Sequence, residues 1–158
     1  MHRIILAIAV LSALGHPAAA APQCAVAADQ SAYEILALRQ MMTVLATKNC
    51  GREGDYNTAF VKRFQPALQA NYRNVGAYFR RVYGGAGQGR MDTFTTELVN
   101  VMSQEASRQT VDFCGRTGLM IGEMNALRSM DDLAAYAAVK NLPPAGINMC
   151  PATAARRR

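Results

Sequence analysis

Histidine is scarce in this sequence and tryptophan is absent. Its only histidines, His2 and His16, lie within the first 20 residues, and it has no tryptophan. If that first segment is cleaved from the chain, no imidazole remains for a Ser–His–Asp or Cys–His catalytic arrangement. The same absence excludes every zinc site that uses histidine as a ligand.

A hydrophobic run long enough to cross a membrane is also missing. The longest apolar run, 4–14, has about eleven residues, whereas a transmembrane helix needs about 20. This run follows the positively charged Arg3 and precedes Ala18-Ala19-Ala20, an arrangement typical of a secretory signal peptide cleaved after its last alanine. We therefore expect residues 1–20 to be a signal peptide. The mature protein should be exported, periplasmic or secreted, without a transmembrane segment.

Cysteines at metal-site or redox spacing are absent as well. The four cysteines are separated by 26, 64 and 36 residues, so there is no Cys-x-x-Cys motif and none of the close pairs typical of structural zinc sites. An even number of cysteines in an exported chain predicts disulfide bonds. Three pairings are open from the sequence. We favour Cys50–Cys114, joining two helices, and Cys24–Cys150, joining the ends of the mature chain.

The chain that follows the expected signal peptide is basic and has the size of one domain. Loss of Arg3 leaves sixteen basic and eleven acidic residues, a formal net charge of +5. About 138 residues suffice for one domain that buries roughly two-thirds of its surface. We assign 21–150 to a single helical domain and 151–158, which ends in three arginines, to a basic flexible tail.

Hydrophobic residues recur at helical intervals of three and four through most of this chain. No stretch alternates apolar and polar residues convincingly enough to predict a strand. The sequence therefore predicts an all-α fold, a compact bundle of four or five helices stabilised by two disulfides. The first helix is apolar over most of its circumference, so other elements should nearly surround it. The predicted helices cover 31–48, about 55–83, about 92–108, a fourth helix that starts near 110 and includes Met124, and 133 to about 141.

Capping residues and helix breakers predict where these helices begin and end. Ser31 and Glu34 form a capping-box pattern, and Asp131 or Asp132 is expected to cap the last helix. Pro66 removes one amide from the long second helix, so we expect one bent helix, with two abutting helices as the alternative. The glycine-rich stretch 84–89 lacks the Gly-Lys-Ser/Thr ending of a phosphate loop, and we interpret it as a flexible connection.

Three of these features, together with the signal peptide, resemble a loose group of small exported bacterial helical proteins that have four cysteines and no assigned activity. The features are the apolar first helix ending in Asn49-Cys50, the aromatic start of the second helix at Tyr56 and Phe60, and Phe113-Cys114 in a late helix. The resemblance implies a helical fold and implies no function.

Charge is segregated along the chain. Residues 56–91 contain six basic and no acidic residues, whereas residues 92–132 contain seven acidic and three basic ones. These bases either pair with acidic neighbours in the same molecule or form a binding face for an anionic partner. Another protein or an anionic envelope component fits an exported chain better than nucleic acid, and no exposed aromatic row is predicted to stack bases. The candidate face on the second helix consists of Lys62, Arg63, Arg73, Arg80 and Arg81.

Two polar residues on apolar helices form a second candidate site. Arg39 lies in the middle of the first helix, and Asn100 lies on the helix 92–108. They either line an internal pocket for a small ligand or are a surface arginine and a satisfied core amide. The methionines at 41, 42, 120 and 124 fall on inward faces, so we interpret them as packing residues rather than soft-metal ligands.

Carboxylates are the remaining candidates for catalysis. Asp92 and Glu97 lie about 140° apart around a helix, and Glu97 and Glu105 are separated by about 12 Å, so neither pair marks a glycosidase-type cleft. The sequence therefore predicts a non-catalytic binding protein, without cofactor or metal, that acts through the basic face of the second helix. The alternatives, in order, are a carrier of a small apolar ligand inside the bundle and an enzyme that uses carboxylates.

Overall fold

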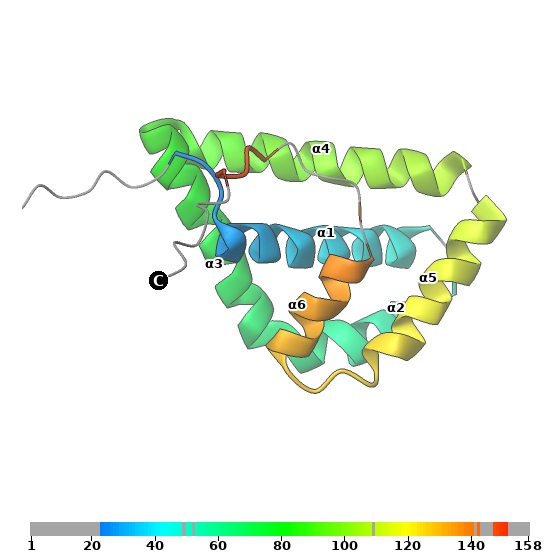
Figure 1. The fold of residues 1–158 in the computed structure, drawn as a ribbon. Helices are drawn as coiled ribbons and strands as arrows, with labels where there is room; N and C mark the ends of the chain where they lie inside the picture. The colour runs from blue at the N-terminus through cyan, green and yellow to red at the C-terminus, as the bar shows by residue number, and fades with distance from the viewer. Residues whose placement is uncertain are drawn as a thin grey trace, which may run out of the picture.

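The described part of the chain is helical throughout, apart from short connections, in a computed structural model (Figure 1). The structure describes residues 23–48, 50–51, 53–108, 110–140, 142 and 147–151, so the expected signal peptide and most of the basic tail lie outside it. The all-α class and the two disulfides are confirmed. The elements are α1 (Ala27–Thr47), α2 (Glu53–Tyr56), η1 (Asn57–Lys62), α3 (Arg63–Tyr83), η2 (Gly84–Ala86), α4 (Gly87–Arg108), α5 (Thr110–Met124) and α6 (Met130–Val139).

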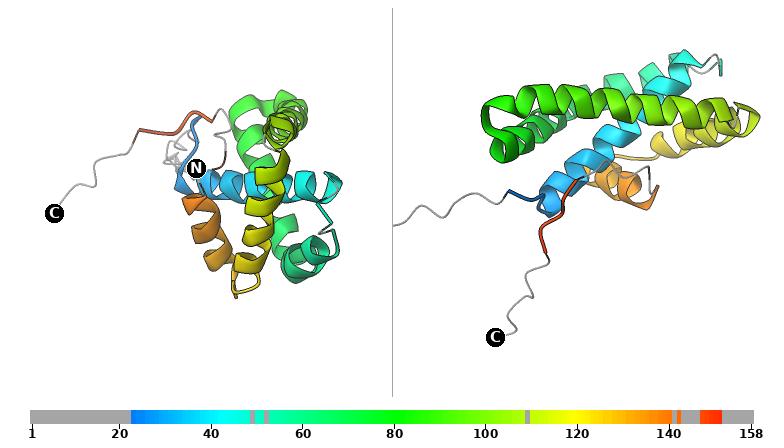
Figure 2. Two further views of the ribbon diagram at one scale, coloured as in Figure 1. Left: turned by 90° about the vertical axis from the view of Figure 1, so that its right-hand side faces the viewer. Right: turned by 90° about the horizontal axis from the view of Figure 1, so that it is seen from above.

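Helix α1 is the centre of the fold. It lies between α4 on one side and α2 and α6 on the other in Figure 1, and seen from above it passes obliquely beneath α4 (Figure 2). Helices α3 and α5 also contact it. The expectation that other elements nearly surround this helix is confirmed, because most of its apolar side chains are buried. The buried set is Ala32, Tyr33, Ile35, Leu36, Ala37, Leu38, Met42, Val44 and Leu45.

Helix α1 begins earlier than the sequence pattern predicts. Its first residue is Ala27, and Ser31 lies within the helix. The carboxylate of Asp29 accepts a hydrogen bond from the Val26 amide at 2.8 Å. Asp29 therefore supplies the returning half of a capping box, and no serine is needed at the helix start.

The long second helix is continuous through Pro66. Helical structure runs from Glu53 to Tyr83, and Pro66 lies within α3. The segment Asn57–Lys62 has the wider π-helical winding. Pro66 has no amide N–H that could donate a hydrogen bond to the Lys62 carbonyl. The π-helical segment ends at Lys62. The structure therefore shows one continuous helical run that contains a π-helical segment, and not two abutting helices.

The glycine-rich stretch 84–89 is not a flexible connection. It forms the short 3₁₀ turn η2 and then the first turn of α4. A Cβ atom on Gly87 would lie 2.8 Å from the backbone of Arg80 and of Phe79. This glycine is therefore required for close packing of α4 against α3, a role that local sequence does not reveal.

The last helix is capped by Ser129 rather than by Asp131 or Asp132. The Ser129 hydroxyl accepts a hydrogen bond from the Asp132 amide at 3.1 Å, and the Asp132 carboxylate accepts one from the Ser129 amide at 3.0 Å. This reciprocal capping box starts α6 at Met130, earlier than expected. Helix α5 runs from Thr110 to Met124, so its predicted start near Thr110 is confirmed.

Both disulfides have the favoured pairing. Cys50–Cys114 ties the connection that follows α1 to α5, and Cys24–Cys150 joins the two ends of the described chain. Beside the second bond, Ala25 and Met149 form an isolated parallel β-bridge. The Ala25 amide donates to the Asn148 carbonyl and the Cys150 amide donates to the Ala25 carbonyl, each at 2.8 Å. The segment before α1 is thus held by covalent and hydrogen bonds together.

Candidate functional site

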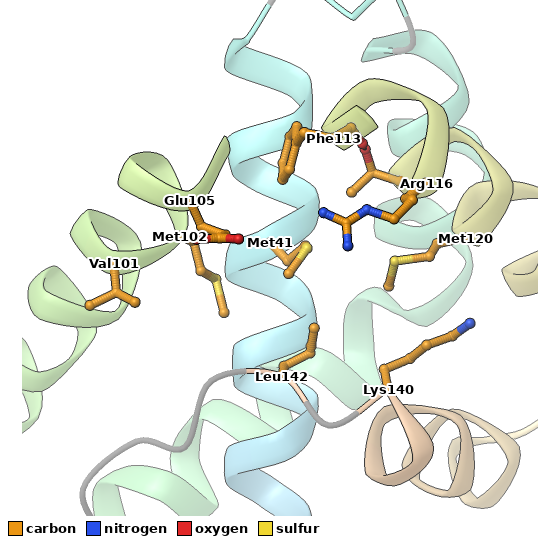
Figure 3. A pocket seen from close by; sticks show the side chains of 10 residues that line it. Met41, Val101, Met102, Glu105, Phe113, Arg116, Met120, Lys140 and Leu142 are labelled. Carbon is orange, nitrogen blue, oxygen red and sulfur yellow. The ribbon is translucent and has the colours of Figure 1, made fainter. Parts of the chain in front are cut away.

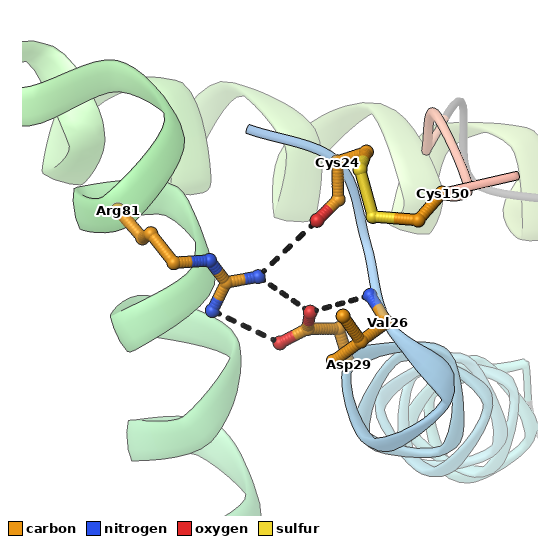
Figure 4. The surroundings of a disulfide bond; sticks show 5 residues. All are labelled: Cys24, Val26, Asp29, Arg81 and Cys150. Atoms are coloured by element: carbon orange, nitrogen blue, oxygen red, sulfur yellow. Dashed lines mark hydrogen bonds and ion pairs between the residues drawn. A yellow bond between two sulfur atoms is a disulfide. The ribbon is translucent and has the colours of Figure 1, made fainter. Parts of the chain in front are cut away.

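Arg81, one of the five predicted binding arginines and lysines, is engaged inside the molecule. Its guanidinium lies 2.5 Å from the Asp29 carboxylate and donates to the Cys24 carbonyl at 3.4 Å (Figure 4). It also lies over the Tyr78 ring, 5.3 Å from the ring centroid. For this residue the structure supports pairing within the molecule, so Arg81 is removed from the binding face.

Arg63 also has partners within the fold. Its guanidinium donates to the Asn125 carbonyl at 2.9 Å and to the Leu127 carbonyl. It lies over the Phe64 ring at 5.6 Å. The two carbonyls follow the C-terminal end of α5, where a cation is favoured by the helix dipole. Arg63 therefore joins α3 to the connection between α5 and α6, and it too is removed from the binding face.

The remaining three bases, Lys62, Arg73 and Arg80, are exposed. Arg73 of α3 and Arg39 of α1 both line a hollow of about 590 Å³, which we call the arginine hollow. Within the described residues, neither guanidinium makes a hydrogen bond or an ion pair. None of the described residues that line the hollow is acidic. The other lining residues are Gln40, Thr43, Gln69, Tyr72 and Thr95.

Arg39 and Asn100, the predicted internal polar pair, are not brought together. Arg39 is half-buried at the arginine hollow, whereas Asn100 is exposed on α4. Asn100 lines a separate polar hollow of about 450 Å³ with Ser103, Gln104, Ser107 and Arg108. Neither residue lines the apolar pocket described next, so the predicted pair does not form one internal site.

An apolar pocket, whose lining residues the sequence analysis did not assign to a site, lies between α1, α4 and α5, and we call it the methionine pocket. It has a volume of about 350 Å³. Met41, Met102 and Met120 reach it from three helices, and the Arg116 side chain points between them in Figure 3. The sequence signal was the inward methionines, which also fit ordinary core packing. The other lining residues are Val101, Glu105, Phe113, Thr117, Lys140 and Leu142.

The carboxylates considered for catalysis do not converge. The exposed Asp92 carboxylate accepts a hydrogen bond from the Gln88 side-chain amide at 2.9 Å, inside α4, which begins at Gly87. Glu97 lines a small aromatic hollow, and Glu105 lines the methionine pocket. Two carboxylates flanking one substrate bond are therefore not provided by these three residues.

Buried tyrosines join α1, α3 and α4 near the Glu97 hollow. The Tyr33 ring packs edge-on against Tyr78 and Phe94, with centroids 5.4 and 5.1 Å apart. Burial raises the pKa of the Tyr33 hydroxyl well above its ordinary value, and burial also raises the pKa of Tyr78. Both phenols therefore stay protonated at neutral pH, and the rings contribute to packing between the three helices.

The described ranges also bear on two further kinds of feature, clusters of metal ligands and membrane-spanning helices. No group of three or more cysteine or carboxylate side chains there is arranged to hold a metal ion. Within the same ranges, no helix combines the length and the apolar character that crossing a bilayer demands. None of the protein-family models, curated proteins and solved structures compared with this chain matches it.

Proposed function

We propose that this protein is an exported, non-catalytic binding protein whose arginine hollow holds an anionic group of an envelope component. The observation that carries the proposal is that Arg39 and Arg73, from two different helices, line the same hollow. Neither has an acidic partner among the described residues. Two arginines so placed have charge that the described part of the fold leaves uncompensated.

The chemistry of the hollow supports an anion rather than a cation or a purely apolar ligand. Arginine presents a planar fork of donors that matches the oxygens of a phosphate or carboxylate. Gln40 and Gln69 add amide donors, whereas the Thr43 and Thr95 hydroxyls donate to the Arg39 and Met91 carbonyls of their own helices. Because Arg39 is half-buried, its interactions are screened less by water and salt than those of a fully exposed arginine.

Export is part of the proposal, and the two disulfides support it. Disulfides persist in oxidising compartments and are rare in the cytosol. In such a compartment the accessible anions include lipid phosphates, acidic glycans and the carboxylates of other proteins. A lipid phosphate is the form that we place in the hollow, since an envelope surface presents such groups at high local density.

The experiment is a flotation assay with the mature protein and vesicles of phosphatidylglycerol, with phosphatidylcholine vesicles as the neutral match. The variants are Arg39→Gln and Arg73→Gln, and the matched control is Arg80→Gln, which removes the same charge from α3 outside the hollow. We expect both hollow variants to lose most of the binding and the control to keep it. Binding by the hollow variants equal to that of the control would contradict the proposal.

Competition separates the possible sources of the anion. Inorganic phosphate and a soluble acidic polysaccharide are added in turn to the vesicle assay at constant ionic strength. Release by phosphate supports recognition of the lipid phosphate itself. Release by the polysaccharide alone would overturn the lipid assignment and favour an acidic glycan, with a protein partner as the remaining alternative.

A further inference from the structure

The methionine pocket lies outside the arginine hollow and calls for a ligand of different chemistry. Its wall is formed by thioether, aromatic and aliphatic side chains, among them Met41, Phe113 and Leu142. Its volume of about 350 Å³ lies in the range of small-molecule sites. We propose that this pocket binds an amphipathic acid, with the apolar chain among the methionines and the carboxylate on Arg116.

The methionines favour a flexible apolar chain. Met102 and Met120 are buried, whereas Met41 is half-buried at the pocket. Methionine is unbranched and polarizable, so its side chain adapts to ligands of irregular shape. A cation such as a soft metal ion is disfavoured, because Arg116 brings a permanent positive charge to the place where the thioethers meet (Figure 3).

The charges at the pocket point to an acidic head group. The Arg116 guanidinium points into the pocket in Figure 3, whereas the Lys140 amine points away. That amine lies 2.5 Å from the Glu123 carboxylate. The pairing of Arg116 with Asp112 is long, at 3.8 Å, and exposed. Because arginine carries five N–H donors, a ligand carboxylate beside the apolar wall can pair with Arg116 without displacing the partners that this residue already has.

Glu105 sets a limit on the ligand. It lies across the pocket from Arg116 in Figure 3, and its carboxylate is half-buried. Its negative charge opposes an acid bound on its own side and so directs the head group to Arg116. Neutralising Glu105 should therefore strengthen binding of an acid, whereas neutralising Arg116 should weaken it.

The experiment uses methyl-¹³C-methionine NMR of the disulfide-bonded mature protein, with octanoate as the probe and 1-octanol as its neutral match. We expect octanoate to shift the methyl signals of Met41, Met102 and Met120. The signals of the core residue Met124 and the exposed residue Met149 should stay in place. Shifts absent from the three pocket methionines, or spread equally over all five, would overturn the proposal.

Three variants test the head-group assignment in the same titration. Arg116→Gln should weaken octanoate binding by roughly three- to tenfold and leave 1-octanol unaffected. Glu105→Gln should strengthen octanoate binding. Arg73→Gln removes an equal charge at the arginine hollow and should change neither ligand's affinity, so this proposal and the proposed function fail independently. Equal affinity of the Arg116→Gln and Arg73→Gln variants for octanoate would refute the role of Arg116.

Discussion

The Arg81 guanidinium and the Asp29 carboxylate form an ion pair 2.5 Å long between α3 and the first turn of α1. Their side chains are only 23% and 10% exposed, respectively. The same guanidinium reaches the carbonyl of Cys24, whose sulfur is bonded to Cys150 (Figure 4). Arg81 thus connects the C-terminal end of α3 to the capped start of α1 and to the Cys24–Cys150 disulfide beside it.

Loss of this ion pair should destabilise the fold. Arg81→Gln leaves the Asp29 carboxylate mostly buried without its cation, and we expect a loss of about 2 kcal/mol in the free energy of unfolding. Arg80→Gln, at the exposed neighbouring position, should change it by less than about 0.5 kcal/mol. Urea unfolding of the two variants measures the difference. Equal stability of the two would show that the pair contributes nothing.

Close packing of α4 on α3 should make Gly87 intolerant of any side chain. Gly87→Ala places a methyl group 2.8 Å from backbone atoms that cannot move aside, and we expect a loss of about 1–3 kcal/mol. Gly89→Ala is the matched control, because no atom lies within 4 Å of its Cβ position. That change should stabilise the helix by about 0.5–1 kcal/mol. Thermal unfolding followed by circular dichroism will show whether the two changes have opposite signs.

The cap of α6 should be sensitive to Ser129 and insensitive to Asp131. Ser129→Ala removes the acceptor of the Asp132 amide, and we expect it to cost about 1 kcal/mol. Asp131→Asn leaves both capping hydrogen bonds in place and should have little effect. The readout is urea unfolding, with amide exchange of α6 as a local measure. A larger loss from Asp131→Asn than from Ser129→Ala would contradict the assignment of the cap.

Acid should weaken the contact of α6 with α5 through Glu123. Its pKa is lowered by a hydrogen bond from the Lys140 amine and a further one from the Tyr136 hydroxyl. A lowered folded-state pKa means that the carboxylate stabilises the fold above its unfolded pKa, about 4.3, and that this contribution is lost as pH falls through the folded pKa. Because the side chain is half-exposed, we expect a small effect.

The measurement compares wild type with Glu123→Gln in urea at several pH values. The stability difference should be largest near pH 6 and should shrink toward pH 3. Glu97→Gln is the control, since Glu97 is exposed on α4, away from this cluster. A difference that stays constant over this range would show that Glu123 does not titrate with folding.

Several features of the fold were predictable because they depend on neighbouring residues along the chain. The start of α5 near Thr110 was predicted correctly, and the disulfide pairing favoured from the positions of the cysteines on the predicted helices and chain ends is the one observed. Other helix ends were wrong by a few residues. Asp29 caps α1 without a serine, and Ser129 rather than an aspartate begins α6, because several residues compete locally for each cap.

The sequence by itself determined the helical class, the covalent framework and the concentration of arginines on one helix. Only the tertiary structure decided what each arginine does. Arg81 forms an ion pair with Asp29, and Arg63 donates a hydrogen bond to a carbonyl just after α5. Arg73 lines the arginine hollow together with Arg39. The physical reason is that helical periodicity describes a residue's own helix, whereas the partner of a charged side chain is set by whichever helix packs across from it.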